Sequence, residues 1–385
     1  MSVESATLMN SDWSSWLTRW SEAGLIDGAT ADRIRTFEQA RGGQRRLRWP
    51  IIIALAFGGL MVGGGILLFV AAHWDALSPA MRFTTVLMMV GGLHVGGALA
   101  ADRFPAMSVT LHAIGTIALG AGIALSGQIF NLDEHWPGGI MMWALGAGLA
   151  AWLLRDSPQI VFFAILGPLW LGAEWIDAHG PFGRYLDEMS ASILAGGGVA
   201  LALTYLSAVT ATHHTHIRRA LMWTGGMTLP PLAVGLAFAT ADDWTGTLWP
   251  ITTLLIVGSV VAIGLPLGLA FGLRGRDAWQ NALAMLWIGI LVVLGQFTSD
   301  LPLFAWWAVG AIGLVAWGVA EARVERINLG AVAFAATVLT FYFSQVMDKL
   351  GRSASLIGLG LLFLGGGWAL ERLRRQLVGE VRGEK

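Results

Sequence analysis

The chain has no cysteine among its 385 residues, which excludes disulfide bonds, thiolate metal sites and cysteine nucleophiles. Charged residues are also scarce, at 13% of the chain against about 25% in soluble proteins. Hydrophobic residues make up 55%. A chain of this composition is expected to be surrounded by lipid rather than by water.

Motifs of common enzyme classes are absent as well. The sequence contains no GxSxG, no P-loop and no HExxH, and no carboxylate lies deep in an apolar run. The histidines of "THHTHIRR" (212–219) have a spacing that fits no firm metal site, so we interpret them as part of a loop. We therefore expect no catalytic residue, no metal and no cofactor, and a protein that is not an enzyme.

Long apolar runs are what the sequence does contain. They predict an all-α, polytopic membrane protein with about twelve transmembrane helices, each near the length that crosses a bilayer. The predicted spans are 51–72, 82–101, 107–129, 139–154, 159–176, 190–208, 219–239, 248–273, 279–297, 302–320, 327–346 and 353–370. The first run begins near Trp49, so we expect no cleaved signal peptide.

Basic residues are distributed unevenly between the two sides of these spans. With twelve spans, 20 of the 24 lysines and arginines fall on the side of both termini, and eleven acidic residues fall on the other side. Because cytoplasmic loops carry the excess of lysine and arginine, both termini should be cytoplasmic. The pattern indicates a multi-pass membrane protein.

The same pattern divides the chain into four segments. They are a cytoplasmic amphipathic helical hairpin (1–48), a first six-helix half (49–208), a second six-helix half (209–371) and a basic cytoplasmic tail (372–385).

The hairpin segment has one apolar helical face. Trp13, Trp16, Leu17 and Trp20 recur at helical spacing, and Thr30 is the expected cap of the second helix. The hairpin either holds a protein partner, or packs on itself or on the membrane surface. Nothing in the sequence indicates a nucleic-acid partner.

The two membrane halves resemble each other. "RFTTVLMMVGG" matches "PITTLLIVGSV", which places Thr84 on Thr252, and "SGQIF" matches "LGQFT", which places Gln128 on Gln296. We interpret this as an internal duplication into two parallel six-helix repeats, related by a rotation about the membrane normal.

Interrupted helices at matching positions of two such halves point to a site at the membrane midplane. The candidate residues of this midplane site are Gly63, Gly64, Gly65, Thr228, Pro230 and Pro231. The alternative is close helix packing through small residues, which the 51 glycines of the chain would also support.

Two histidines fall inside predicted spans. His94 and His112 lie about 10 and 8 Å from the same membrane face at 1.5 Å per residue, so they form a candidate intramembrane polar pair. The alternative is a neutral pair that only joins two helices by a hydrogen bond.

Polar residues also gather where spans reach the acidic side. They form a candidate outer vestibule of His73, Asp75, Gln128, Asn131, Asp133, Glu134, His135 and Gln296. The alternative is an ordinary wet rim with tryptophan at the interface.

Three stretches resemble a known bacterial family, domain of unknown function 2157. They are "AAHWDALSPAMRF", "GAGIALSGQIFNLDEHW" and "INLGAVAFAATVLTFYF". The resemblance extends over most of the chain, and His73 stands where the family usually has asparagine. It implies a multi-pass inner-membrane protein and transfers no activity, cofactor or catalytic residue.

These observations leave three functional hypotheses. The first is a transport-like or solute-binding role at the interface of the two halves, with lipid as the surrounding partner. The second is a non-catalytic envelope scaffold that binds a partner through the hairpin. The third is a membrane-embedded enzyme acting on lipid or glycan.

The topology predicts the behaviour of reporter fusions. Fusions after Lys385 and within 209–218 should report a cytoplasmic location, and fusions within 131–138 and 241–247 a periplasmic one, because of the uneven distribution of basic residues. A periplasmic signal from the C-terminal fusion would overturn the assignment.

Overall fold

A computed structural model describes residues 13–41, 78–130, 135–180, 183–184, 186–210, 213, 215–240, 252–295 and 301–346, with single positions in 54–68 and 358–372. Every regular element in these ranges is a helix. The first two, α1 (Trp13–Glu22) and α2 (Gly28–Arg41), pack on each other as a hairpin.

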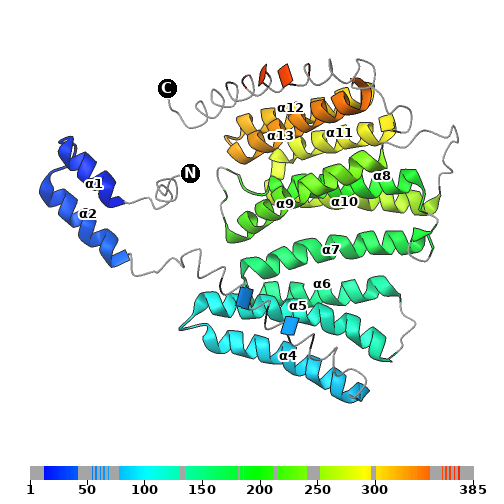
Figure 1. The fold of residues 1–385 in the computed structure, drawn as a ribbon, viewed down its shortest axis with the longest axis horizontal. Helices are drawn as coiled ribbons and strands as arrows, with labels where there is room; N and C mark the ends of the chain where they lie inside the picture. The colour runs from blue at the N-terminus through cyan, green and yellow to red at the C-terminus, as the bar shows by residue number, and fades with distance from the viewer. Residues whose placement is uncertain are drawn as a thin grey trace.

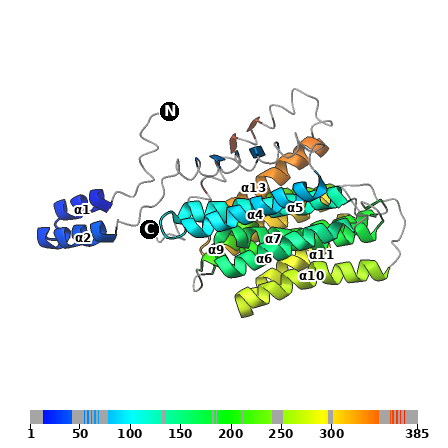
Figure 2. The same cartoon turned by 90° about the horizontal axis from the view of Figure 1, so that it is seen from below.

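The remaining helices lie side by side as a bundle (Figure 1). They are α4 (Pro79–Ala100), α5 (Pro105–Phe130), α6 (Trp136–Leu154), α7 (Ser157–Ala178), α8 (Glu188–Leu206), α9 (His216–Ala239), α10 (Thr253–Arg274), α11 (Trp279–Gly295), α12 (Leu301–Ala320) and α13 (Val324–Phe341). A short 3-10 helix (Gly275–Ala278) joins α10 to α11, and a π-helical turn (Tyr342–Val346) follows α13. Seen from below, α10 and α13 lie on opposite faces of the bundle (Figure 2).

Nine helical segments among the described residues are long and apolar enough to cross a membrane. The longest, Thr253–Gly295, has 43 residues and contains both α10 and α11. The all-α, membrane-spanning architecture expected from the sequence is therefore confirmed, and ten of the twelve predicted spans coincide with α4 to α13. The predicted spans 51–72 and 353–370 fall largely outside the described residues, so the count of twelve and the internal repeat remain predictions.

The sequence explains where many of these helices begin. Side chains of Ser78, Asp156, Asp187, Thr215 and Thr252 each accept a hydrogen bond from a backbone N–H in the first turn that follows. Such caps satisfy donors that have no partner inside the helix. The expected cap of α2 is wrong: Asp27 accepts from the Thr30 N–H at 2.8 Å, because α2 begins at Gly28 and Thr30 already lies inside it.

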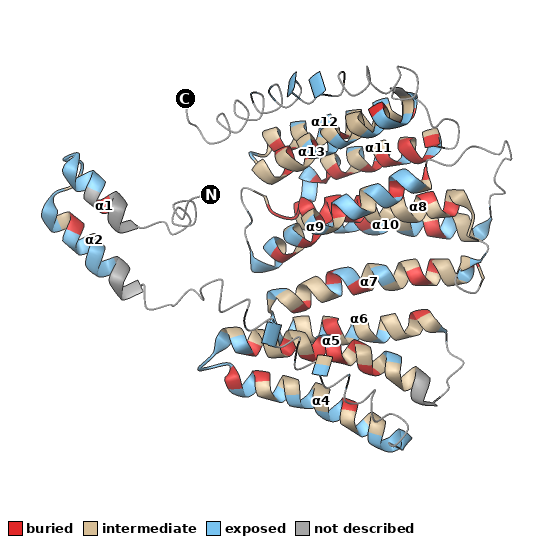
Figure 3. Cartoon of the chain, in the orientation of Figure 1, coloured by how far each residue is buried: buried red, intermediate tan, exposed pale blue. Residues whose placement is uncertain are grey.

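Helix α8 is the most buried helix of the bundle as described (Figure 3). It packs against α9, α10 and α11. Val199, Leu203 and Leu206 join Leu236 and Leu291 in the largest buried apolar cluster. The core of the described bundle is therefore centred on α8.

Arginines from three other helices reach the carbonyl groups that follow α8. Arg274 donates to the Ser207 carbonyl at 3.0 Å, and Arg218 donates to the Ala208 carbonyl at 2.8 Å. Arg326 donates to the Val209 carbonyl at 3.5 Å. These carbonyls lie at the negative end of the helix dipole, where cations are stabilising. We call the end of the bundle that carries this contact the basic end.

The Glu321 carboxylate forms ion pairs with two of these arginines and offsets part of their charge. It contacts Arg274 at 2.5 Å and Arg326 at 2.7 Å, and the Trp317 indole N–H donates to it at 2.7 Å. Both guanidinium groups also lie over the Trp317 ring, at 5.3 and 4.8 Å from its centroid.

Glu321 carries its charge at neutral pH. Burial by itself raises the pKa of Glu321, but hydrogen bonds and charges from Arg274, Arg326 and Trp317 outweigh burial, and the pKa lies below its ordinary value of 4.5. The contribution of Glu321 to stability is therefore present above pH 4.5 and is lost as the pH falls through the lowered pKa.

The arginine contacts predict a large loss of stability when Arg326, which is fully buried, is replaced. Arg326→Met should lower the free energy of unfolding by about 3 kcal/mol, because it removes one partner of a buried ion pair. Arg219→Met, in the same region but exposed, should change it by less than about 0.5 kcal/mol. Unfolding of the detergent-solubilised protein measures the free energy of both variants. Equal losses of stability in the two variants would contradict the role of the buried Arg326 guanidinium.

Candidate functional site

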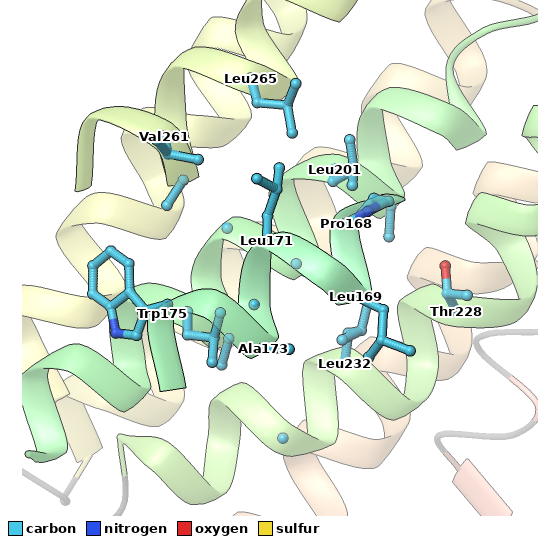
Figure 4. Close-up of a pocket in the computed structure, with 18 of the residues that line it drawn as sticks. Pro168, Leu169, Leu171, Ala173, Trp175, Leu201, Thr228, Leu232, Val261 and Leu265 are labelled. Carbon is cyan, nitrogen blue, oxygen red and sulfur yellow. The ribbon is translucent and has the colours of Figure 1, made fainter. Parts of the chain in front are cut away.

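A cavity of about 760 Å³ lies between α7, α8, α9 and α10, with the start of α6 at one edge. Figure 4 shows apolar side chains from these helices around the open space, with Thr228 among them. Along α8 the lining extends from Ala191 to Tyr205, which is about 21 Å at 1.5 Å per residue. Leu169, Ile165 and Leu265 in the lining keep 51%, 41% and 37% of their surface exposed, so no described protein atoms fill the space beside them.

The lining contains many small residues and three helix-interior prolines. Of the glycines in the lining, Gly235 has open space beside it, whereas a Cβ at Gly197 would lie 2.8 Å from Ala262 and one at Gly198 would lie 3.1 Å from Leu232, so these two mark close helix contacts. Pro168, Pro231 and Pro266 each lie inside a helix and line the cavity. Because each proline lacks a backbone N–H, each frees the carbonyl four residues earlier.

One freed carbonyl is satisfied from across the cavity. Pro168 frees the Ala164 carbonyl, and the Tyr205 hydroxyl of α8 donates to that carbonyl at 3.1 Å. All three residues line the cavity. This hydrogen bond connects α7 to α8 and satisfies a carbonyl that would be costly to leave unpaired inside a membrane-spanning helix.

The midplane site predicted from the sequence overlaps only partly with this cavity. Thr228 and Pro231 line it, and Pro230 does not. Gly64 and Gly65 have open space around the position of a Cβ and do not belong to the lining, and Gly63 lies outside the described residues. The sequence prediction missed Pro168 and Pro266, although the same signal, proline inside an apolar span, identifies both.

The structure brings His94 and His112 together between α4 and α5. Their Nδ1 atoms are 3.0 Å apart, and their ring centroids are 5.3 Å apart. A Cβ at Gly97 would lie 2.9 Å from the His112 ring, and one at Gly115 would lie 2.9 Å from the His94 ring, so each ring fits over a glycine of the opposite helix. A hydrogen bond between the two rings needs one Nδ1 that carries a proton and donates it, and one Nδ1 that accepts it.

Further polar groups follow this pair toward α7. Thr116, one turn after His112, donates to the Gln159 side-chain oxygen at 2.8 Å, and the Trp143 indole donates to the Thr116 carbonyl at 2.8 Å. Gln159 is fully buried. Burial also raises the pKa of Asp156, the cap of α7. The hydrogen bond from the Gln159 backbone N–H lowers this pKa, but by less than burial raises it.

His135 is the residue of the predicted vestibule that the structure places in a defined cluster. Its Nε2 lies 2.6 Å from Glu174 and its Nδ1 lies 3.0 Å from Asp177, both on α7. The hydrogen bond to Glu174 raises the pKa of His135 above its ordinary value of 6.5, and Asp177 adds to the effect. His73, Asp75, Asn131, Asp133, Glu134 and Gln296 lie outside the described residues, and of Gln128 only its place in α5 is described.

His213 and His216, which the sequence pattern assigns to a loop, are both exposed, and His216 is the first residue of α9. Within the described ranges, no three histidine, aspartate or glutamate side chains are grouped so that they could hold a metal ion.

Comparison with known proteins supports the family resemblance for part of the chain. Residues 18–160 match the sequence model of a family described as "Predicted membrane protein (DUF2157)". The matched region covers most of the hairpin and α4 to α6, whereas α8 to α10 and the stretch "INLGAVAFAATVLTFYF" lie beyond it. No curated protein and no solved structure matches the chain.

The bond between Tyr205 and the Ala164 carbonyl predicts a coupling between two substitutions. Tyr205→Phe should lower the free energy of unfolding by about 1 kcal/mol, because the carbonyl freed by Pro168 loses its donor. In a Pro168→Ala background the same substitution should cost much less, because the new backbone N–H at 168 can donate to that carbonyl. A double-mutant cycle in detergent measures the coupling, and equal costs in both backgrounds would contradict it.

Proposed function

We propose that the protein binds an apolar or amphipathic solute in the cavity between α7 and α10, in a transport-like role. The observation that carries the proposal is the position of the cavity: α7 and α8 come from the predicted first half of the chain, and α9 and α10 from the second. Ligand sites between two halves are typical of transporters built from repeats.

The size and chemistry of the cavity favour an acyl chain. Its volume of about 760 Å³ falls within the range of about 300–1,000 Å³ for small-molecule pockets. Its length of about 21 Å exceeds the roughly 15 Å that one acyl chain spans in half of a 30 Å hydrocarbon core. The Thr228 hydroxyl donates to its own helix, and the Tyr205 hydroxyl to α7, so the lining offers few free polar groups.

The scaffold hypothesis remains the second candidate, because other helix contacts are tightly closed by glycine. A Cβ at Gly225 would overlap the backbone of α8, and one at Gly330 would overlap the backbone of α12. Such contacts let helices approach closely and favour a rigid framework. In both readings we propose an inner-membrane protein with cytoplasmic termini and without enzymatic activity.

Filling the cavity tests the proposal. Gly235 lines the cavity, and a Cβ there meets no atom within 4 Å, so Gly235→Phe should occupy the space without displacing backbone. We expect it to weaken binding of a single-chain phosphocholine with a fluorescent acyl chain by at least about tenfold, or about 1.4 kcal/mol. The measurement is a titration of the purified protein in detergent.

Gly264→Phe is the matched control, because Gly264 is exposed on α10, has the same open surroundings and does not line the cavity. It should bind the probe as the unchanged protein does. If neither the unchanged protein nor the control binds the probe above detergent background, or if Gly235→Phe binds it equally well, the scaffold function replaces the binding function.

A further inference from the structure

The cluster around His135 joins the start of α6 to the last turns of α7. Each carboxylate uses one oxygen for His135 and the other for a tryptophan. The Trp170 indole donates to Glu174 at 2.7 Å, and the Trp136 indole donates to Asp177 at 2.7 Å. Both carboxylates are therefore oriented toward the imidazole, and they are not free to rotate toward other donors.

This geometry favours a protonated imidazole. A neutral histidine has one N–H and one acceptor nitrogen, whereas an imidazolium has two N–H donors. Contacts of 2.6 Å and 3.0 Å from the two ring nitrogens to two carboxylates use both donors. Loss of the proton would leave one nitrogen lone pair facing a carboxylate, which is repulsive.

The cluster also borders the cavity. Trp136, which follows His135 directly, lines the cavity, as do Trp175 and Ile176, which lie between the two carboxylates on α7. The contacts of His135 and Trp136 with α7 thus hold the first turn of α6 at this edge of the cavity, and only the contact of His135 depends on a titratable proton.

From this juxtaposition we propose that His135 is a proton-dependent latch, which holds the start of α6 against α7 and closes the adjacent edge of the cavity. The part of the inference that concerns ligand access rests on the proposed function, whereas the latch itself does not.

The sign of the effect follows from the charges that face His135. Glu174 and Asp177 on α7 are the charged groups of the described chain that act on it, and α6 contains no charged residue. Both carboxylates favour the imidazolium, and they raise the pKa of His135 above 6.5. The latch is therefore closed at pH 6.5, where the imidazolium faces two carboxylates, and it opens as the pH rises through the raised pKa.

Spin labels can report the latch directly in this cysteine-free chain. Suitable positions are Gly138→Cys on α6, where a Cβ meets no atom within 4 Å, and Phe238→Cys on α9, which is 74% exposed. In full-length protein, raising the pH from about 5.5 to about 9 should broaden the distance distribution about twofold, because the start of α6 is released. The His135→Gln background should show the broad distribution at both pH values.

Two results would overturn the latch: an unchanged distribution between the two pH values, or the same pH response in the His135→Gln background. Glu174→Gln, which removes one carboxylate and keeps the histidine, should shift the transition to lower pH. If the distance distribution of Glu174→Gln broadens at the same pH as that of the unchanged protein, a group other than His135 controls the transition.

Ligand access is measured separately by the dissociation rate of the fluorescent single-chain phosphocholine, whose headgroup does not titrate in this range. We expect dissociation at least about threefold faster at pH 9 than at pH 5.5, and no pH effect with His135→Gln. If the labels respond to pH but the probe does not bind, the proposed function fails and the latch stands. If the probe binds but its dissociation rate is the same at both pH values, control of access by the latch is refuted.

Discussion

The contact between three arginines and the carbonyl groups after α8 is the constraint on which the described bundle depends. Arg218, Arg274 and Arg326 come from α9, α10 and α13, and each donates to one of three consecutive carbonyls. A buried carbonyl without a donor and a buried guanidinium without an acceptor are both costly near lipid. Because each guanidinium donates to one of these carbonyls, the contact fixes the position of the start of α9, the end of α10 and the start of α13 relative to α8.

Glu321 and Trp317 complete this constraint. Two buried arginines beside each other would repel, and a single carboxylate shared between them, with an aromatic ring beneath both, makes the arrangement stable. Because these residues come from α10, α12 and α13, the second half of the chain is attached to α8 at the basic end.

The cavity lies between α7, α8, α9 and α10. Prolines in α7, α9 and α10 line it, and the Tyr205 hydroxyl satisfies one carbonyl that a proline frees. At the edge near His135, the contact between α6 and α7 depends on ionisable groups of moderate exposure. The bundle thus has a buried ion-pair contact at the basic end and a partly exposed contact of ionisable groups, between α6 and α7, at the other.

The sequence by itself determined the helices and some local neighbours. Apolar runs must become helices in lipid because only a helix satisfies its own backbone, and this reasoning located α4 to α13 within a few residues. It also predicted that His94 and His112 lie at one level, since a short turn makes α4 and α5 antiparallel. Only the tertiary structure decided which distant helices meet. Three of the arginines that indicated topology, Arg218, Arg274 and Arg326, contact the carbonyl groups after α8, and a cavity among the described residues lies between α7 and α10. The physical reason is that apolar periodicity assigns a helix to lipid but does not encode its neighbours, which depend on side-chain pairs far apart in the chain.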